Sequence, residues 1–181
     1  YNTALELAEQ NYRDYPENMY QIQAYFDCLI HNLPLNAQQQ EDIENMIESV
    51  RIIANTKITE MYYQIEAKYA AFIESNYNKA SKYILKGLVD FPHSFYLNKD
   101  YFDICRKNHD ILGMENALKD LKQSRMFDDA NYKITLETRE TILDAYKGKS
   151  PISIQLKLNN LSYLSASAFD NLYQAIIEIS E

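Results

Sequence analysis

The chain has little glycine and proline, no tryptophan and only two cysteines. Three Gly and four Pro in 181 residues provide too few turn residues for a fold of many short strands, so helices should dominate. Two cysteines exclude a disulfide-rich scaffold and fit a reducing cytoplasm. Because no run of about 18 apolar residues occurs, we expect no membrane-spanning helix. The composition predicts a mainly all-α, cytoplasmic protein.

Basic residues are scarce in the first third of the chain. Residues 1–60 hold three Lys/Arg against ten Asp/Glu, a net charge of −7, whereas residues 61–150 carry +1 and residues 151–181 carry −2. An acidic chain lacks the electrostatic footprint of a nucleic-acid-binding protein, so we expect no direct contact with nucleic acid. The acidic stretch is either a solvated helix face or a surface for a basic partner.

The stretch from residue 61 to residue 94 is typical of two amphipathic helices joined by a tight turn. Ser75 and Asn76 interrupt the pattern, and Asn76 can cap the second helix. Pro92 lies just past that helix and cannot continue it. The apolar residues at helical spacing are Met61, Ile65, Tyr69, Phe72 and Ile73 in the first helix and Tyr77, Ala80, Ile84, Leu85 and Leu88 in the second.

This 34-residue stretch resembles a tetratricopeptide (TPR) repeat. The positions that match the aromatic, small, large, small and proline residues of that family are Tyr77, Ala80, Ile84, Gly87 and Pro92. The positions that depart from its usual Trp, Leu and Gly are Gln64, Ala67 and Lys68. The resemblance implies a solenoid of antiparallel helix pairs.

Further helices are predicted on both sides of this stretch. Ala4 and Pro16 repeat the spacing of Ala80 and Pro92, so the chain should begin within a repeat and be a fragment of a longer protein. Asn36 and Gln39 resemble a capping box before an acidic helix. The other predicted features are helices over 17–32 and 95–107, a turn over 108–113, a helix from Met114, and a helix from Asp128 or Asp129 to about Lys147 that Gly148 ends. We assign residues 1–149 to the repeat domain.

The pattern changes at Ser150, and two interpretations of the next residues remain open. The apolar residues of 152–158 alternate with polar ones, which is typical of a half-buried strand. Pro151 can instead start a helix. A last helix is predicted after Ser167. Residues 150–181 are therefore either a cap of the repeat domain or the start of another domain.

Signatures of catalysis are absent from the sequence. The pairs Cys28–His31 and Cys105–His109 have spacings that a helix can use for metal, but they occupy equivalent places in two repeats that stacking should separate. We interpret them as buried thiols and surface imidazoles. No glycine-rich phosphate loop or Gly-x-Ser-x-Gly motif occurs, and the carboxylates fit solvated helix faces. We expect no catalytic residue, no metal site, no cofactor and no enzymatic activity.

The TPR resemblance implies a binding groove lined by the first helix of each repeat. Transferred to this chain, its positions are Tyr20, Gln23, Asp27, Ile30 and His31, then Tyr62, Ile65, Tyr69, Phe72 and Ile73, then Tyr96, Lys99, Asp103, Arg106 and Lys107. The alternative for Tyr62, Tyr69 and Phe72 is that they only pack between helices. The carboxylate clamp of chaperone-binding TPR proteins is not matched, because Gln23 and Asp27 replace its Lys and Asn.

These observations favour a scaffold that binds a protein or peptide within a larger multidomain protein. In that interpretation the aromatic residues supply contact area, and Arg106 and Lys107 contact acidic groups of the partner. One alternative is the sensor domain of a peptide-responsive bacterial transcription regulator. Another is an enzyme with an unrecognised site. The sequence does not predict the oligomeric state.

Overall fold

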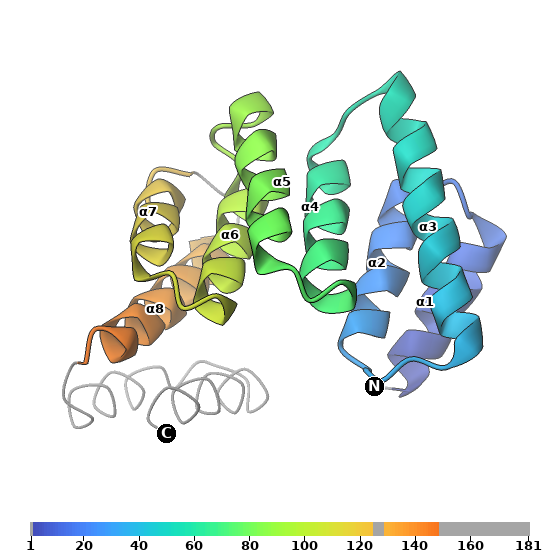
Figure 1. The fold of residues 1–181 in the computed structure, drawn as a ribbon, viewed down its shortest axis with the longest axis horizontal. Helices are drawn as coiled ribbons and strands as arrows, with labels where there is room; N and C mark the ends of the chain where they lie inside the picture. Colours follow the sequence, from blue (N-terminus) through green and yellow to red (C-terminus); the bar gives the residue numbers. More distant parts are fainter. Residues whose placement is uncertain (1, 125–128, 149–181) are drawn as a thin grey trace. The chain divides into compact units, whose positions relative to one another are not determined.

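Every secondary-structure element of the described chain is helical. The computed structural model describes residues 2–124 and 129–148 (Figure 1). Its elements are α1 (Asn2–Asp14), α2 (Met19–Ile30), α3 (Ala37–Thr56), α4 (Glu60–Lys68), the π-helix η1 (Tyr69–Ile73), α5 (Tyr77–Asp90), α6 (Phe95–Lys107), α7 (Ile111–Leu121) and α8 (Asp129–Tyr146). The all-α prediction is confirmed. The strand predicted over 152–158 and the helix predicted after Ser167 lie outside the described residues.

The chain divides into two compact units. Unit 1 comprises residues 1–91 and contains α1 to α5 with η1, and unit 2 comprises residues 92–181 and contains α6 to α8. The boundary coincides with Pro92, which has no backbone N–H to donate and cannot extend α5. No other sequence pattern marks this division.

Short polar side chains fix several helix starts as predicted. Asn36 and Gln39 form the capping box of α3: the Asn36 side chain accepts from the Gln39 N–H at 2.9 Å, and the Gln39 side chain accepts from the Asn36 N–H at 3.0 Å. Asn76 caps α5 by accepting from the Lys79 N–H at 2.9 Å. These bonds satisfy N–H groups that have no partner within the helix.

The start of α7 and the end of α8 test two predicted helix boundaries. The predicted turn over residues 108–113 is longer than the observed one, because Asp110 accepts from the Gly113 N–H at 2.9 Å and α7 begins at Ile111. At the end of α8, Gly148 adopts a φ of 70°, a left-handed conformation that glycine reaches without steric cost. The predicted stop at Gly148 is confirmed.

Helix α4 lies at the centre of unit 1 and packs against α2, α3 and α5. Its residues from Tyr63 to Ala67 are all buried, including two polar ones. Helix α2 packs more extensively against α1 than against α3, its predicted partner, and Tyr12 stacks on Tyr25 with ring centroids 5.4 Å apart. The main core of the unit consists of Ala8, Tyr12, Ile22, Tyr25, Phe26, Leu29, Ile30, Ile43, Met46, Ile47, Val50 and Ile65.

Unit 2 has its own core between α6, α7 and α8. The buried residues of this core are Phe102, Cys105, Met114, Ala117, Leu118, Ile142 and Leu143. Tyr132 of α8 donates to the Leu121 carbonyl at 3.0 Å, and Lys122 pairs with Glu140 at 2.5 Å. These contacts join α8 to the end of α7.

A close approach of α5 to α4 explains the small residues of the predicted repeat. Ala80 is fully buried, and Gly87 is also buried. A Cβ added at Gly87 would lie 2.8 Å from both Cβ and Cγ of Tyr63. Because Tyr63 Cβ is attached to the α4 backbone, the two helices would have to move apart to accept it.

Substitution Gly87→Ala should therefore destabilise the protein even though Ala is the better helix former. Overpacking costs roughly 1–3 kcal/mol and the helix-propensity gain is about 1 kcal/mol, so the middle of this range gives an expected net loss of about 1 kcal/mol in urea denaturation. Lys86→Ala, at an exposed position of the same helix, serves as the control. A Gly87→Ala protein as stable as the wild type would show that α4 and α5 do not meet at this residue.

Candidate functional site

A pocket of about 610 Å³ lies beside η1 in unit 1. Three segments build it: the loop after α2, the first turns of α3, and η1 itself. Its lining residues are Leu33, Pro34, Leu35, Gln40, Ile43, Glu44, Tyr69, Phe72 and Ile73. Most of the lining is apolar with a few polar groups, and its volume is in the range of ligand pockets.

The loop wall of the pocket is held by bonds to the start of α3. Gln40 donates from its side chain to the Leu35 carbonyl at 3.3 Å, and the capping box of α3 fixes the chain at Asn36. The Leu33–Pro34 peptide bond is cis. Leu33 lines the pocket and remains 47% exposed, so the pocket lining includes an accessible apolar side chain.

The opposite wall is the π-helix η1. The Glu74 N–H donates to the Tyr69 carbonyl, five residues earlier, at 3.1 Å, and the Asn76 N–H donates to the Ala70 carbonyl at 2.7 Å. Ala70 and Ala71 are buried, whereas Phe72 is 37% exposed. The pocket thus borders on a partly exposed aromatic ring. Single-turn π-helices are rare and occur frequently at functional sites.

Polar pairs join α2 to α4 next to the pocket. Gln23 donates to Gln64 at 3.3 Å, and Lys68 pairs with Asp27 at 2.7 Å. The two pairs follow the same order along both helices, so α2 and α4 run parallel. Gln64 and Lys68, which depart from the TPR pattern, are therefore the partners of two residues predicted to line the groove.

The other predicted groove residues of unit 1 differ in accessibility. Tyr20 is 70% exposed, Ile65 is completely buried, and Tyr62 is half-buried with its ring edge-on to Tyr63. Tyr69 and Phe72 line the pocket. The pocket therefore brings together only part of the predicted set, together with loop and α3 residues that the sequence did not indicate.

The predicted groove residues of unit 2 lie on α6. Tyr96 is 48% exposed, Lys107 is exposed and Lys99 is partly buried. Asp103 accepts from Arg139 of α8 at 2.6 Å, and the Arg106 carbonyl accepts from the Tyr146 hydroxyl at 3.1 Å. The contact of Arg106 and Lys107 with an acidic partner stays a prediction.

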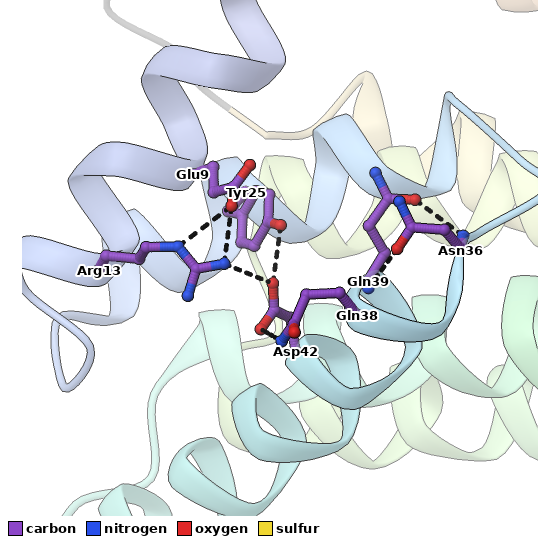
Figure 2. Close-up of polar contacts among 7 residues, drawn as sticks. All are labelled: Glu9, Arg13, Tyr25, Asn36, Gln38, Gln39 and Asp42. Atoms are coloured by element: carbon purple, nitrogen blue, oxygen red, sulfur yellow. Dashed lines mark hydrogen bonds and ion pairs between the residues drawn. The ribbon is translucent and has the colours of Figure 1, made fainter.

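The sequence suggested that all carboxylates lie on solvated helix faces. The structure shows that some of them are buried. Asp42 of α3 is only 4% exposed and accepts from Tyr25 at 2.9 Å, Gln38 at 3.2 Å and Arg13 at 3.4 Å (Figure 2). Arg13 also donates to Glu9 at 2.7 Å. Figure 2 shows that this network links α1, α2 and α3. Burial, followed by the hydrogen bond to Asp42, raises the pKa of Tyr25 well above its ordinary value.

Glu66 of α4 is another buried carboxylate, with 1% exposure. Arg51 of α3 donates to it through two nitrogens, at 2.6 and 3.0 Å, and this bidentate geometry is the strongest form of the pair. Hydrogen bonding to Glu66 raises the pKa of Arg51. Sequence reasoning missed Asp42 and Glu66 because their partners come from other helices.

The cysteines and histidines are not among the residues that line the pocket. Both cysteines are free, and burial raises the pKa of the Cys105 thiol to about 12, which makes it a poor nucleophile at neutral pH. His31, His93 and His109 are exposed. Within residues 2–124 and 129–148, no group of three or more His, Cys, Asp or Glu side chains is arranged to hold a metal ion.

Comparison with protein families, characterised proteins and solved structures finds no match to this chain. In the part of the chain that the structure describes, no helix is both long and apolar enough to cross a bilayer.

The raised pKa of Tyr25 predicts a pH-dependent stability. Below pH 10 the phenol is protonated in both states; above it the unfolded chain ionises first, so stability falls by at most about 1.4 kcal/mol per pH unit until the folded-state pKa is reached. Between about pH 8.5 and about pH 11, the free energy of unfolding measured with urea should fall by about 1 kcal/mol more for the wild type than for Tyr25→Phe. Equal losses would contradict the assignment.

The Arg51–Glu66 pair predicts a coupled effect of two substitutions. Arg51→Met leaves a buried carboxylate without its guanidinium and should cost about 1–2 kcal/mol, a value reduced by the partial exposure of Arg51. Adding Glu66→Gln should restore part of this loss because no buried charge then remains. Additive effects in a double-mutant cycle would mean that the two side chains do not interact.

Proposed function

We propose that this chain is a TPR-like helical-repeat module that binds a protein or peptide within a larger protein, and that the pocket of unit 1 receives an apolar side chain of the partner. The observation that carries the proposal is the accessible apolar surface at the pocket: Leu33 is 47% exposed and Phe72 is 37% exposed. Covering this surface contributes about 25 cal/mol per Å².

Features within each unit support the repeat architecture. The turn before α5 contains Ser75 with a φ of 53° followed by the cap Asn76, and the turn before α7 contains His109 with a φ of 54° followed by the cap Asp110. The two turns are 34 residues apart (109 minus 75), the length of a TPR repeat. The parallel course of α2 and α4 also supports it, because first helices of neighbouring repeats run in the same direction.

Free cysteines at positions 28 and 105 support a reducing compartment, and we propose the cytoplasm.

The proposal is tested by selecting peptides from a random displayed library on the purified chain. The selected peptides are then synthesised, and their affinities are measured by fluorescence polarisation. They should share one large apolar residue. Phe72→Ala and Leu33→Ala should each weaken binding about fivefold to tenfold, because central apolar contacts dominate such interfaces.

Leu85→Ala is the matched control, because Leu85 is 47% exposed but lies on α5 outside the pocket lining. Thermal melting should show that the pocket variants stay folded. If no peptide is enriched, or if the selected peptides bind both pocket variants as tightly as the wild type, the pocket is not the binding site.

A further inference from the structure

A row of exposed polar side chains extends from the pocket along α3. Gln40 and Glu44 line the pocket, and Glu48 follows one turn later. All three are exposed and are spaced four residues apart, so they share one face of the helix. With a rise of 1.5 Å per residue, successive members are about 6 Å apart along the helix axis.

The described ion pairs of unit 1 involve carboxylates other than Glu44 and Glu48. These pairs are Arg13 with Glu9 and Asp42, Arg51 with Glu66, Lys68 with Asp27 and Lys79 with Glu74. Within the described part of the chain, no ion pair joins Glu44 or Glu48 to a Lys or Arg side chain. The carboxylates of Glu44 and Glu48 are therefore exposed and not paired with a described basic side chain.

The first third of the chain, which supplies two of the three segments of the pocket, also has a negative net charge. Residues 1–60, which include α3 and the loop wall of the pocket, carry a net charge of −7. A field of one sign over a binding surface attracts partners of opposite charge and increases their association rate. The pocket and the row together thus present an apolar depression with an anionic strip at one side.

We infer that the partner segment is basic: a large apolar side chain enters the pocket, and Lys or Arg side chains about 6 Å apart pair with Glu44 and Glu48. This inference rests on the proposed binding function and specifies the chemistry of the partner. An extended chain presents such cations two residues apart, and a helix presents them four residues apart. The apolar anchor supplies most of the affinity, whereas exposed charge pairs supply selectivity and rate.

The test uses three synthetic probes that share a Leu anchor, flanked on both sides by Lys, by Ser or by Glu. The wild-type chain should bind the Lys probe at least about fivefold more tightly than the Ser probe, and the Glu probe most weakly. Increasing the NaCl concentration should weaken binding of the Lys probe and leave binding of the Ser probe nearly unchanged.

The protein variants separate local charge from total charge. Glu44→Lys combined with Glu48→Lys should reverse the order of the Lys and Glu probes. Glu6→Lys combined with Glu17→Lys, at exposed positions away from the pocket lining, makes the same change in net charge and should keep the order. If both double variants shift the order equally, or if neither does, the inference is wrong.

Phe72→Ala distinguishes this failure from failure of the proposed function. If it weakens all three probes while the α3 charge reversal changes none, the pocket binds apolar anchors without a preference for cations. If Phe72→Ala leaves all three probes unchanged, the pocket is not the binding site and the inference fails with it.

Discussion

Unit 1 depends on the burial of polar side chains in helix α4. Five consecutive residues from Tyr63 to Ala67 are buried, and a buried carboxylate or amide is costly unless it is hydrogen-bonded. Arg51 of α3 therefore pairs with Glu66, and Gln23 of α2 pairs with Gln64. These bonds specify which side of each neighbouring helix faces α4, a requirement that apolar contacts alone would leave less defined.

The pocket follows from this arrangement. Because the α2–α4 pairs keep the two helices parallel, the loop that leaves α2 and the π-helix that continues α4 come to the same end of the unit. The α3 helix begins in that loop, so its first turns complete the wall. Arg51 of α3 is bonded to Glu66, and no described ion pair involves Glu44 or Glu48 of the same helix. An apolar depression and a negative surface therefore lie next to each other.

Local signals in the sequence predicted most of the helices but little of the candidate site. Asn36 and Asn76 act on N–H groups within three residues, so their capping roles could be predicted without tertiary information. Asp42 and Glu66 obtain partners from other helices. Without knowledge of those partners, an acidic residue in a helical pattern is predicted to be solvent-exposed. Tyr69 and Phe72 were predicted through the repeat pattern, whereas Leu33 and Glu44 belong to a loop and a neighbouring helix that the pattern did not connect to them.

The π-helix has a consequence for how this chain is aligned with proteins built from regular α-helices. A turn closed by a bond from residue 74 to residue 69 holds one residue more than an α-helical turn. One residue corresponds to about 100° of rotation around an α-helix, since 3.6 residues complete a turn. A gap-free alignment with a regular helix would therefore place the end of η1 and the turn that leads to α5 one residue out of register. Correct superposition requires a one-residue insertion within Tyr69–Ile73, where the pocket wall lies.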